Sequence, residues 1–222
     1  MKKWILIFLI ALIFSSCQKS KPKDQLIPKE AKAIEAPKTE VVSLPQETIK
    51  VFNLYRDKKS PDNHFIPSGW MGDYQDIAFN DVHLDNPHSG TTCIKISYSN
   101  KATSGARWAG IYWQQPANNW GGVEAAGFDL KGYKKLIFWA RGENGTERIE
   151  EFKFGGISGN YSDSDTGGIG PVILSKDWQQ FTIDLTGKDL SYIIGGFCWA
   201  TNLDVNPDGA TFYLDDIYYL KD

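Results

Sequence analysis

Residues 135–142 read KLIFWARG, and apolar side chains occupy every second position of this stretch. Successive side chains of a β-strand point to opposite faces of the sheet. Leu136 and Phe138 therefore share one face, which we expect to be buried, and Trp139 and Arg141 share the other. The stretch predicts a strand in a half-buried sheet whose outer face carries a large ring beside a guanidinium.

Similar short runs recur through the second part of the chain, separated by Asn-Pro, Ser-Gly, Gly-Gly, Asn-Gly and Asp-Gly turn signals. No long amphipathic helix and no internal repeat is visible. Several short strands without a repeat favour an all-β, two-sheet β-sandwich jelly roll over a propeller, which needs repeats. We expect strands at residues 51–55, 93–98, 109–114, 135–141, 151–154, 179–184, 193–200 and 211–219.

Residues 51–222 differ in composition from the part before them. They hold all 21 glycines, all ten tyrosines and seven of the eight tryptophans. This length suffices for one domain with a substantial core. The region carries fifteen Lys and Arg against twenty-two Asp and Glu. Nucleic acid requires a basic face, so this acidic composition argues against a nucleic-acid partner.

The first residues predict an export signal. Lys2 and Lys3 precede an apolar run, residues 4–14, that is too short to span a bilayer and fits the core of a signal peptide. Residues 14–17, Phe-Ser-Ser-Cys, resemble a bacterial lipobox. The resemblance implies that the signal peptide, residues 1–16, is removed and that Cys17 is lipidated. Ordinary secretion without the lipid is the alternative.

Residues 17–50 are expected to connect this anchor to the domain. From residue 18 to residue 50 the chain has seven lysines, five acidic residues and four prolines, with no aromatic residue and no glycine. Such a segment has little apolar surface to bury, so we expect an extended tether. The protein would then lie in the bacterial cell envelope, anchored to a membrane with its domain outside the cytoplasm.

The aromatic residues are most concentrated in residues 107–122, RWAGIYWQQPANNWGG. By strand alternation, Trp108 and Tyr112 share one face, and Ile111 and Trp113 share the other. Only one of these sets can point into the core, and the sequence leaves open which set faces outward. Either way, at least one large ring remains on the outer face of a sheet.

Outward rings are suited to sugars. A pyranose ring stacks its apolar C–H face on a flat aromatic, while its hydroxyls need polar side chains. We therefore expect non-catalytic binding of a polysaccharide or oligosaccharide. The candidate ligand residues are Trp70, Asp73, Arg107, Trp108, Tyr112, Trp120, Trp139 and Arg141.

Three segments resemble carbohydrate-binding modules of the galactose-binding-like jelly-roll superfamily. Residues 211–219 (TFYLDDIYY) look like the last strand of these modules, and residues 135–142 and 178–185 look like two earlier strands. The resemblance implies a structural calcium ion bound by Asp215, with Asn53 and Asp57 as candidate partners. It doesn't identify the sugar.

Two other function classes stay open. The chain lacks a nucleophile elbow, a His-Glu-x-x-His motif and a P-loop. A small hydrolase or lyase would therefore use paired carboxylates. A lipoprotein that binds another envelope protein would use the same aromatic residues as a hot spot. Cys93 and Cys198 could form a disulfide, but we favour free thiols. Candidate catalytic acids are Asp73, Glu143, Asp163 and Asp165.

Overall fold

The longest strand, β13 (Ala210–Lys221), is central to a six-stranded antiparallel sheet. The structure is a computed structural model that describes residues 50–221. On one side, β13 pairs with β6 (Lys135–Gly142). On the other side, β4 (Cys93–Tyr98) pairs with its first half and β1 (Lys50–Tyr55) with its second half. A bulge between these halves lets one strand hold both neighbours.

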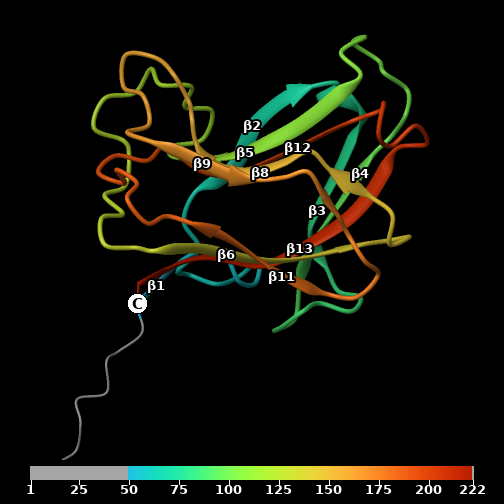
Figure 1. Ribbon diagram of the computed structural model, residues 1–222, viewed down its shortest axis with the longest axis horizontal. Coiled ribbons are helices and arrows are strands. Elements are labelled where there is room, and N and C mark those ends of the chain that lie inside the picture. The colour runs from blue at the N-terminus through green and yellow to red at the C-terminus, as the bar shows by residue number, and fades with distance from the viewer. Residues whose placement is uncertain (1–49, 222) are drawn as a thin grey trace, which may run out of the picture. The chain divides into compact units, whose positions relative to one another are not determined.

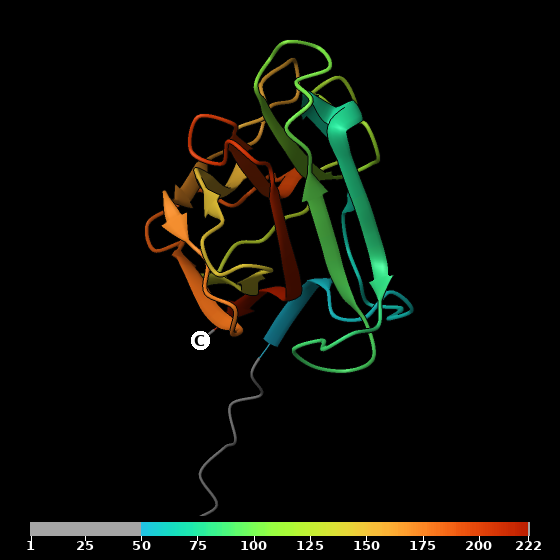
Figure 2. The same ribbon diagram turned by 90° about the vertical axis from the view of Figure 1, so that its right-hand side faces the viewer.

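A second sheet of five antiparallel strands lies against the first (Figure 1). Its order is β2-β5-β12-β8-β9, and that of the six-stranded sheet is β11-β6-β13-β4-β3. Figure 2 shows β3, β4 and β13 side by side. The remaining elements are β2 (Ile66–Gly72), the 3-10 turn η1 (Tyr74–Asp76), β3 (Ile77–His83), β5 (Trp108–Gln114), β7 (Arg148–Ile149), β8 (Glu151–Gly155), β9 (Thr166–Ile169), β10 (Val172–Ile173), β11 (Gln179–Asp184) and β12 (Gly195–Asn202).

The space between the sheets is filled by aliphatic and aromatic side chains, and many of the rings contact one another. The ring of Phe138 on β6 lies 4.7 Å from that of Phe152 and 5.1 Å from that of Phe197. Trp113 on β5 packs edge-on against Phe197 at 5.4 Å. Such offset and edge-to-face contacts add to the free energy gained from burying the rings. Ring packing therefore joins the two sheets together with the aliphatic side chains of the core.

The predicted fold class, an all-β two-sheet sandwich, is confirmed, and each of the eight expected segments contains a strand. The sequence did not predict β2, β3, β7, β9 or β10. Two of these contain residues that are depleted in strands, because β2 includes Pro67 and two glycines and β9 includes two glycines. They form because each pairs with a strand already fixed by the core.

Both cysteines of the described domain are free and buried, as expected. Cys93 is on β4 and Cys198 is on β12, so they belong to different sheets. Burial raises the pKa of the Cys93 thiol to about 12, which keeps it protonated at neutral pH.

The predictions for residues 1–49 lie outside the described residues. These are the signal peptide, the lipidation of Cys17 and all of the linker except Lys50, which begins β1. Residues 50–221 contain no helix that is long and apolar enough to cross a membrane.

We expect Trp113→Ala to lower the free energy of unfolding by about 3–5 kcal/mol, because it leaves a large cavity between the sheets. Urea denaturation followed by circular dichroism measures this change. Ile173→Ala is the control, since that side chain is 66% exposed and its loss should change stability little. An equal effect of both substitutions would contradict the assignment of Trp113 to the core.

Candidate functional site

Strand β5 places two rings on the outer face of the five-stranded sheet. Ile111 and Trp113 belong to the core between the sheets. Alternation along β5 then directs Trp108 and Tyr112 away from the core. This answers the question that the sequence left open. We call the outer surface of this sheet around Trp108, Tyr112 and Trp120 the aromatic face.

The register of the strands gives the aromatic face a low floor. In the row of Tyr112 lie Cys198 and then Lys153. In the next row, Gly110 lies between Met71 and Ala200, so the side chains there are small or flexible. A methyl group on Gly110 would meet the Trp199 carbonyl oxygen at 2.5 Å, so this position requires glycine. The floor therefore lies between Trp108 at one end and Tyr112 at the other.

Trp120 stands above Tyr112 on the loop that follows β5. The two rings meet edge-to-face at 5.9 Å, and the Trp120 side chain is 46% exposed. Tyr112 itself is 4% exposed. Its phenol donates a hydrogen bond to the Gly155 carbonyl at 3.1 Å. Tyr112 was predicted to contact the ligand, but it mainly supports Trp120, which is the accessible ring.

A buried hydrogen-bond network fixes the loop that carries Trp120. The Asn119 side-chain oxygen accepts hydrogen bonds from the main-chain N–H groups of Gly121, Gly122 and Val123. The Gln114 amide donates to the Asn119 carbonyl at 2.9 Å. Satisfied buried networks of this kind rigidify the groups they join. Trp120 is therefore held in place although its ring is exposed.

A second loop, residues 156–165 between β8 and β9, lies at this end of the aromatic face. Gly121 has φ +82°, and a Cβ there would lie 2.2 Å from the Ser158 carbonyl oxygen. The Tyr161 N–H donates to the Gly121 carbonyl at 2.9 Å. Asp163 holds the second loop to the start of β12 by accepting hydrogen bonds from the main chain of Ile194 and Gly195. The two loops therefore pack against each other at Gly121, next to Trp120.

The polar groups of the aromatic face are an ion pair on β8. The Lys153 ammonium lies 3.2 Å from the Glu151 carboxylate and 5.5 Å from the Tyr112 ring centroid. Burial disfavours the charge on Lys153, but hydrogen bonding and charge interactions with Tyr112 and Glu151 outweigh it and raise the lysine pKa. A shallow hollow of about 240 Å³ extends from Glu151 toward β9. Donors and an acceptor therefore lie beside the floor, where ligand hydroxyls can reach them.

Glu151 and Lys153 were not among the predicted ligand residues, although the sequence contained a signal for them. Phe152 and Phe154 occupy the core, so alternation along β8 directs the intervening charged residues outward. The packing role of Asn119 had no sequence signal, because it depends on loops that meet only in the folded chain.

Three other predicted ligand residues have partners within the chain. Trp70 is 37% exposed but packs against Phe79 at the open edge between the sheets, with ring centroids 5.8 Å apart. Arg107 forms an exposed ion pair with Asp204 at 2.8 Å. Asp73 has no exposed surface. Its carboxylate accepts hydrogen bonds from Ser104, Ala106 and Arg107, which lower its pKa, so it holds a loop instead of a ligand.

Trp139 and Arg141 belong to the opposite sheet. Both point outward from the six-stranded sheet as predicted, but the prediction that Trp139 forms an open platform is wrong. The ring of His88 stacks on Trp139 with centroids 3.7 Å apart and planes 18° apart. The loop that carries His88 is held by Asp215, whose carboxylate accepts the His88 N–H at 2.8 Å. Arg141 is buried against Tyr213 and Trp178.

The three residues expected to bind calcium form hydrogen bonds within the chain. Asp215 accepts hydrogen bonds from the N–H groups of His88 and Asp216. Asp57 accepts from the N–H groups of Thr91 and Thr92, and the Asn53 amide donates to Asp62. N–H groups repel a cation, so this arrangement does not fit calcium at these side chains. Residues 50–221 also contain no cluster of three or more His, Cys, Asp or Glu suited to a metal. Calcium binding stays a sequence-based prediction.

The carboxylates considered for catalysis are occupied by structural hydrogen bonds. Asp163 accepts three main-chain N–H groups, and burial raises its pKa. Asp165 binds Lys188 and the Asp189 N–H, and Glu143 accepts the hydroxyl of Tyr213. With Asp73 buried in its loop, the four acids lie in separate networks, and no pair of them lines the aromatic face.

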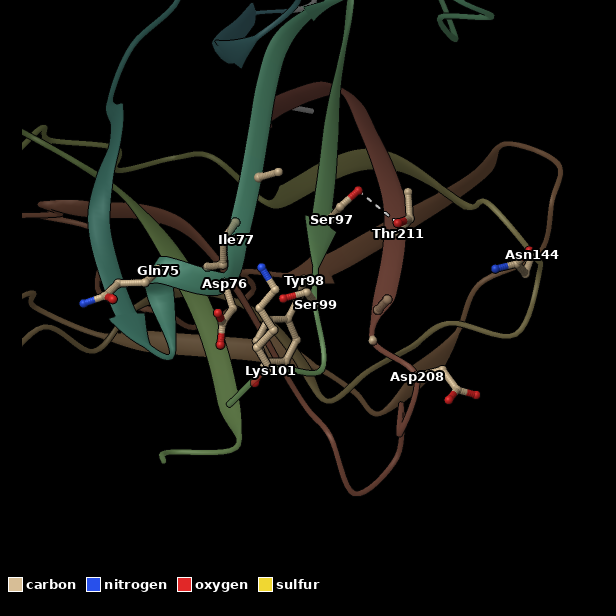
Figure 3. A pocket seen from close by; sticks show the side chains of 13 residues that line it. Gln75, Asp76, Ile77, Ser97, Tyr98, Ser99, Lys101, Asn144, Asp208 and Thr211 are labelled. Atoms are coloured by element: carbon tan, nitrogen blue, oxygen red, sulfur yellow. Dashed lines mark hydrogen bonds between the residues drawn. The ribbon is translucent and has the colours of Figure 1, made fainter. Parts of the chain in front are cut away.

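A polar cavity of about 480 Å³ lies on the other sheet, outside β3, β4 and β13 (Figure 3). Its floor contains the hydroxyls of Ser97 and Thr211, which are hydrogen bonded at 2.9 Å. Asn144, Asp208 and Lys101 stand at its sides. Its aromatic lining residue, Tyr98, is buried. The cavity therefore offers hydrogen bonds but no stacking surface.

The buried carboxyl of Asp215 should make stability depend on pH. Burial and the neighbouring charge of Asp216 raise its pKa to about 7. A carboxyl with a raised pKa stabilises the folded state fully below its unfolded pKa of about 4, and this contribution is lost as the pH rises through 7. We expect the urea midpoint to fall between pH 4 and pH 7, and Asp215→Asn to flatten that slope. Asp208→Asn, at an exposed turn, should keep the wild-type slope. An unchanged slope in Asp215→Asn would contradict the assignment.

Comparisons with solved structures identify the fold of the domain. The chain matches no protein-family model and no curated protein. A family 30 carbohydrate-binding module superposes with a TM-score of 0.52 at 14% identity, over 78% of this chain and 88% of the module. The family 30 module of a cellulosomal cellulase of Clostridium thermocellum gives 0.50 at 14% identity, over 77% and 96%. The family 11 module of another cellulosomal cellulase of Clostridium thermocellum gives 0.50 at 12%, over 79% and 95%. The domain described here has the jelly-roll fold of carbohydrate-binding modules.

Proposed function

We propose that the domain binds a glycan without catalysis, through the aromatic face of the five-stranded sheet. The observation that supports this most directly is the placement of Trp108 and Trp120. Both are accessible, at 40% and 46% exposed, and they stand at opposite ends of the floor formed around Gly110. Rings separated by a low floor suit a ligand with repeated flat apolar faces and polar edges.

The length of the floor favours a chain over a single sugar. Trp108 and Tyr112 are four residues apart on β5, which is about 13 Å in an extended strand. This distance exceeds the width of one pyranose ring. Lys153 and Glu151 lie beside the floor and can donate to and accept from sugar hydroxyls. We therefore expect an oligosaccharide to lie along β5 with a ring stacked at each end.

Substitution of the two tryptophans tests this proposal. We expect Trp108→Ala and Trp120→Ala each to weaken binding about tenfold, which corresponds to about 1.4 kcal/mol. Binding is followed by tryptophan fluorescence with the full-length protein and a panel of oligosaccharides and polysaccharides. Because two similar modules belong to cellulases, the panel begins with cellulose-derived oligosaccharides.

Trp70→Ala is the matched control, since this tryptophan is also exposed but lies at the edge between the sheets. It should leave binding unchanged. Equal losses in all three variants would point to a general structural effect and count against the aromatic face. No binding across the panel by the folded protein would overturn the glycan proposal and favour a protein partner for the same rings.

We also propose that Cys17 is lipidated and anchors the protein to a bacterial membrane, with the domain outside the cytoplasm. The support is the sequence of residues 1–17 alone, in which two lysines are followed by an apolar run and then by Cys17. An acyl chain and a diacylglycerol together provide a stable anchor, whereas one chain binds only marginally.

The test is expression of the full chain in a bacterium with labelled palmitate. The wild-type protein should incorporate the label and partition into detergent. Cys17→Ser should lose the label and move to the aqueous phase. Cys93→Ser is the control, because this buried cysteine should not affect labelling. Membrane partition that persists in Cys17→Ser without label would contradict lipid anchoring.

A further inference from the structure

The outer face of the six-stranded sheet carries a row of charged and aromatic side chains. The strand register places Tyr213 on β13 between Arg141 on β6 and Lys95 on β4. The Arg141 guanidinium carbon lies 3.6 Å from the Tyr213 ring centroid and 5.2 Å from that of Trp178. Two rings therefore fix the plane of the guanidinium on the outside of the sheet.

Arg141 is nearly buried yet has no acceptor within the described domain. Its exposed fraction is 9%, and its buried Nε has no hydrogen-bond partner among residues 50–221. A guanidinium presents five N–H donors, and buried charges are normally paired and hydrogen bonded. The stacked rings orient these donors without satisfying them. The Nε atom is itself buried, so a ligand oxygen can reach only the terminal N–H groups of the guanidinium, which also have no hydrogen-bond acceptor in the described domain.

Lys95 and the carboxylate of Glu143 lie near Arg141. The hydrogen bond from Tyr213 and the charges of Lys95 and Arg141 lower the pKa of Glu143. The Lys95 ammonium lies 5.3 Å from the Tyr213 ring centroid, and the Tyr213 hydroxyl donates a hydrogen bond to the carboxylate of Glu143. Glu143 therefore lies opposite two cations, Lys95 and Arg141, whose combined charge exceeds that of its carboxylate by one. On the neighbouring row, Asp215 accepts hydrogen bonds from main-chain N–H groups.

Two further side chains border this region. Asp216 pairs with the ring of His88 at 2.7 Å. His83 packs against Tyr213 with ring centroids 5.3 Å apart. Neither supplies an acceptor to Arg141, so the guanidinium keeps one positive charge without a hydrogen-bonded counterion in the described part of the chain.

The polar cavity of Figure 3 begins one row away along the same face. Thr211 and Ser97 form its floor. Thr211 lies two residues before Tyr213 on β13, and Ser97 lies two residues after Lys95 on β4. Two residues of a strand span about 7 Å. A ligand that reaches Arg141 can therefore place its next unit over the hydroxyls and the Asn144 amide of the cavity.

We propose that this face is a second ligand site, in which Arg141, assisted by Lys95, binds the carboxylate of an acidic sugar and the cavity binds the hydroxyls of the adjoining sugar. A planar guanidinium matches a carboxylate through two parallel hydrogen bonds. The glycan part of this assignment rests on the proposed function, whereas the acidic group follows from the unpaired guanidinium. The site is on the sheet opposite the aromatic face, so the two can be tested separately.

The experiment is calorimetric titration of the full-length protein with trigalacturonate and with its methyl ester, which has the same rings without the charge. We expect the acid to bind at least tenfold more tightly than the ester. Arg141→Gln should weaken binding of the acid at least tenfold, and Arg141→Lys should restore part of it. Lys95→Gln should weaken binding several-fold. Trp120→Ala, on the opposite sheet, should leave it unchanged.

Several results would overturn the proposal. These are equal binding of acid and ester, undiminished binding in both Arg141→Gln and Lys95→Gln, loss of acid binding in Trp120→Ala, or no binding of trigalacturonate or of a glucuronate disaccharide. If Arg141→Gln fails to fold, Lys95→Gln and the ester comparison decide. A sulfated disaccharide that binds while both uronates fail would also reject the carboxylate. Loss of neutral glycan binding in Trp120→Ala with acid binding retained would separate the second site from the aromatic face.

Discussion

The burial of Trp113 between the two sheets is the constraint on which the aromatic face depends. Trp113 packs on Phe197 in the core, and the two-residue period of a strand then fixes the outward direction of Trp108 and Tyr112. A shift of β5 by one residue would exchange the two sets and expose Trp113. The burial of Ile111 together with Trp113 therefore also determines that Trp108 and Tyr112 remain outside.

Loops complete the aromatic face that strand β5 begins. Trp120 follows β5 in the chain, but its position depends on the buried amide of Asn119 and on the contact of Gly121 with Ser158. The low floor depends on Gly110, where the Trp199 carbonyl leaves no space for a side chain. The aromatic face thus combines exposed rings with a support that is buried and hydrogen bonded, and a rigid support limits the entropy lost on binding.

The sequence predicted the sandwich and most of its strands because alternation is a local property. It could not decide which face of residues 108–113 points outward, because both faces carry a tryptophan. It also placed Trp139 on an open surface, since nothing near residue 139 shows that His88 covers the ring. Asp73 was misassigned for the same reason, because its hydrogen-bond donors lie about thirty residues away in the chain. Local patterns specify direction, whereas burial depends on distant segments.

The outer faces of the two sheets show how burial by distant segments affects function. On the six-stranded sheet the chain supplies its own stacking partner, because His88 occupies the face of Trp139 and Asp215 holds the loop in place. On the five-stranded sheet no corresponding loop within the described domain covers Trp108 and Trp120, and both stay accessible. A ring covered by its own chain contributes to stability, and one left open over a small floor is available to a ligand. The same residue type therefore has different roles on the two sheets, and the loops decide which role each ring has.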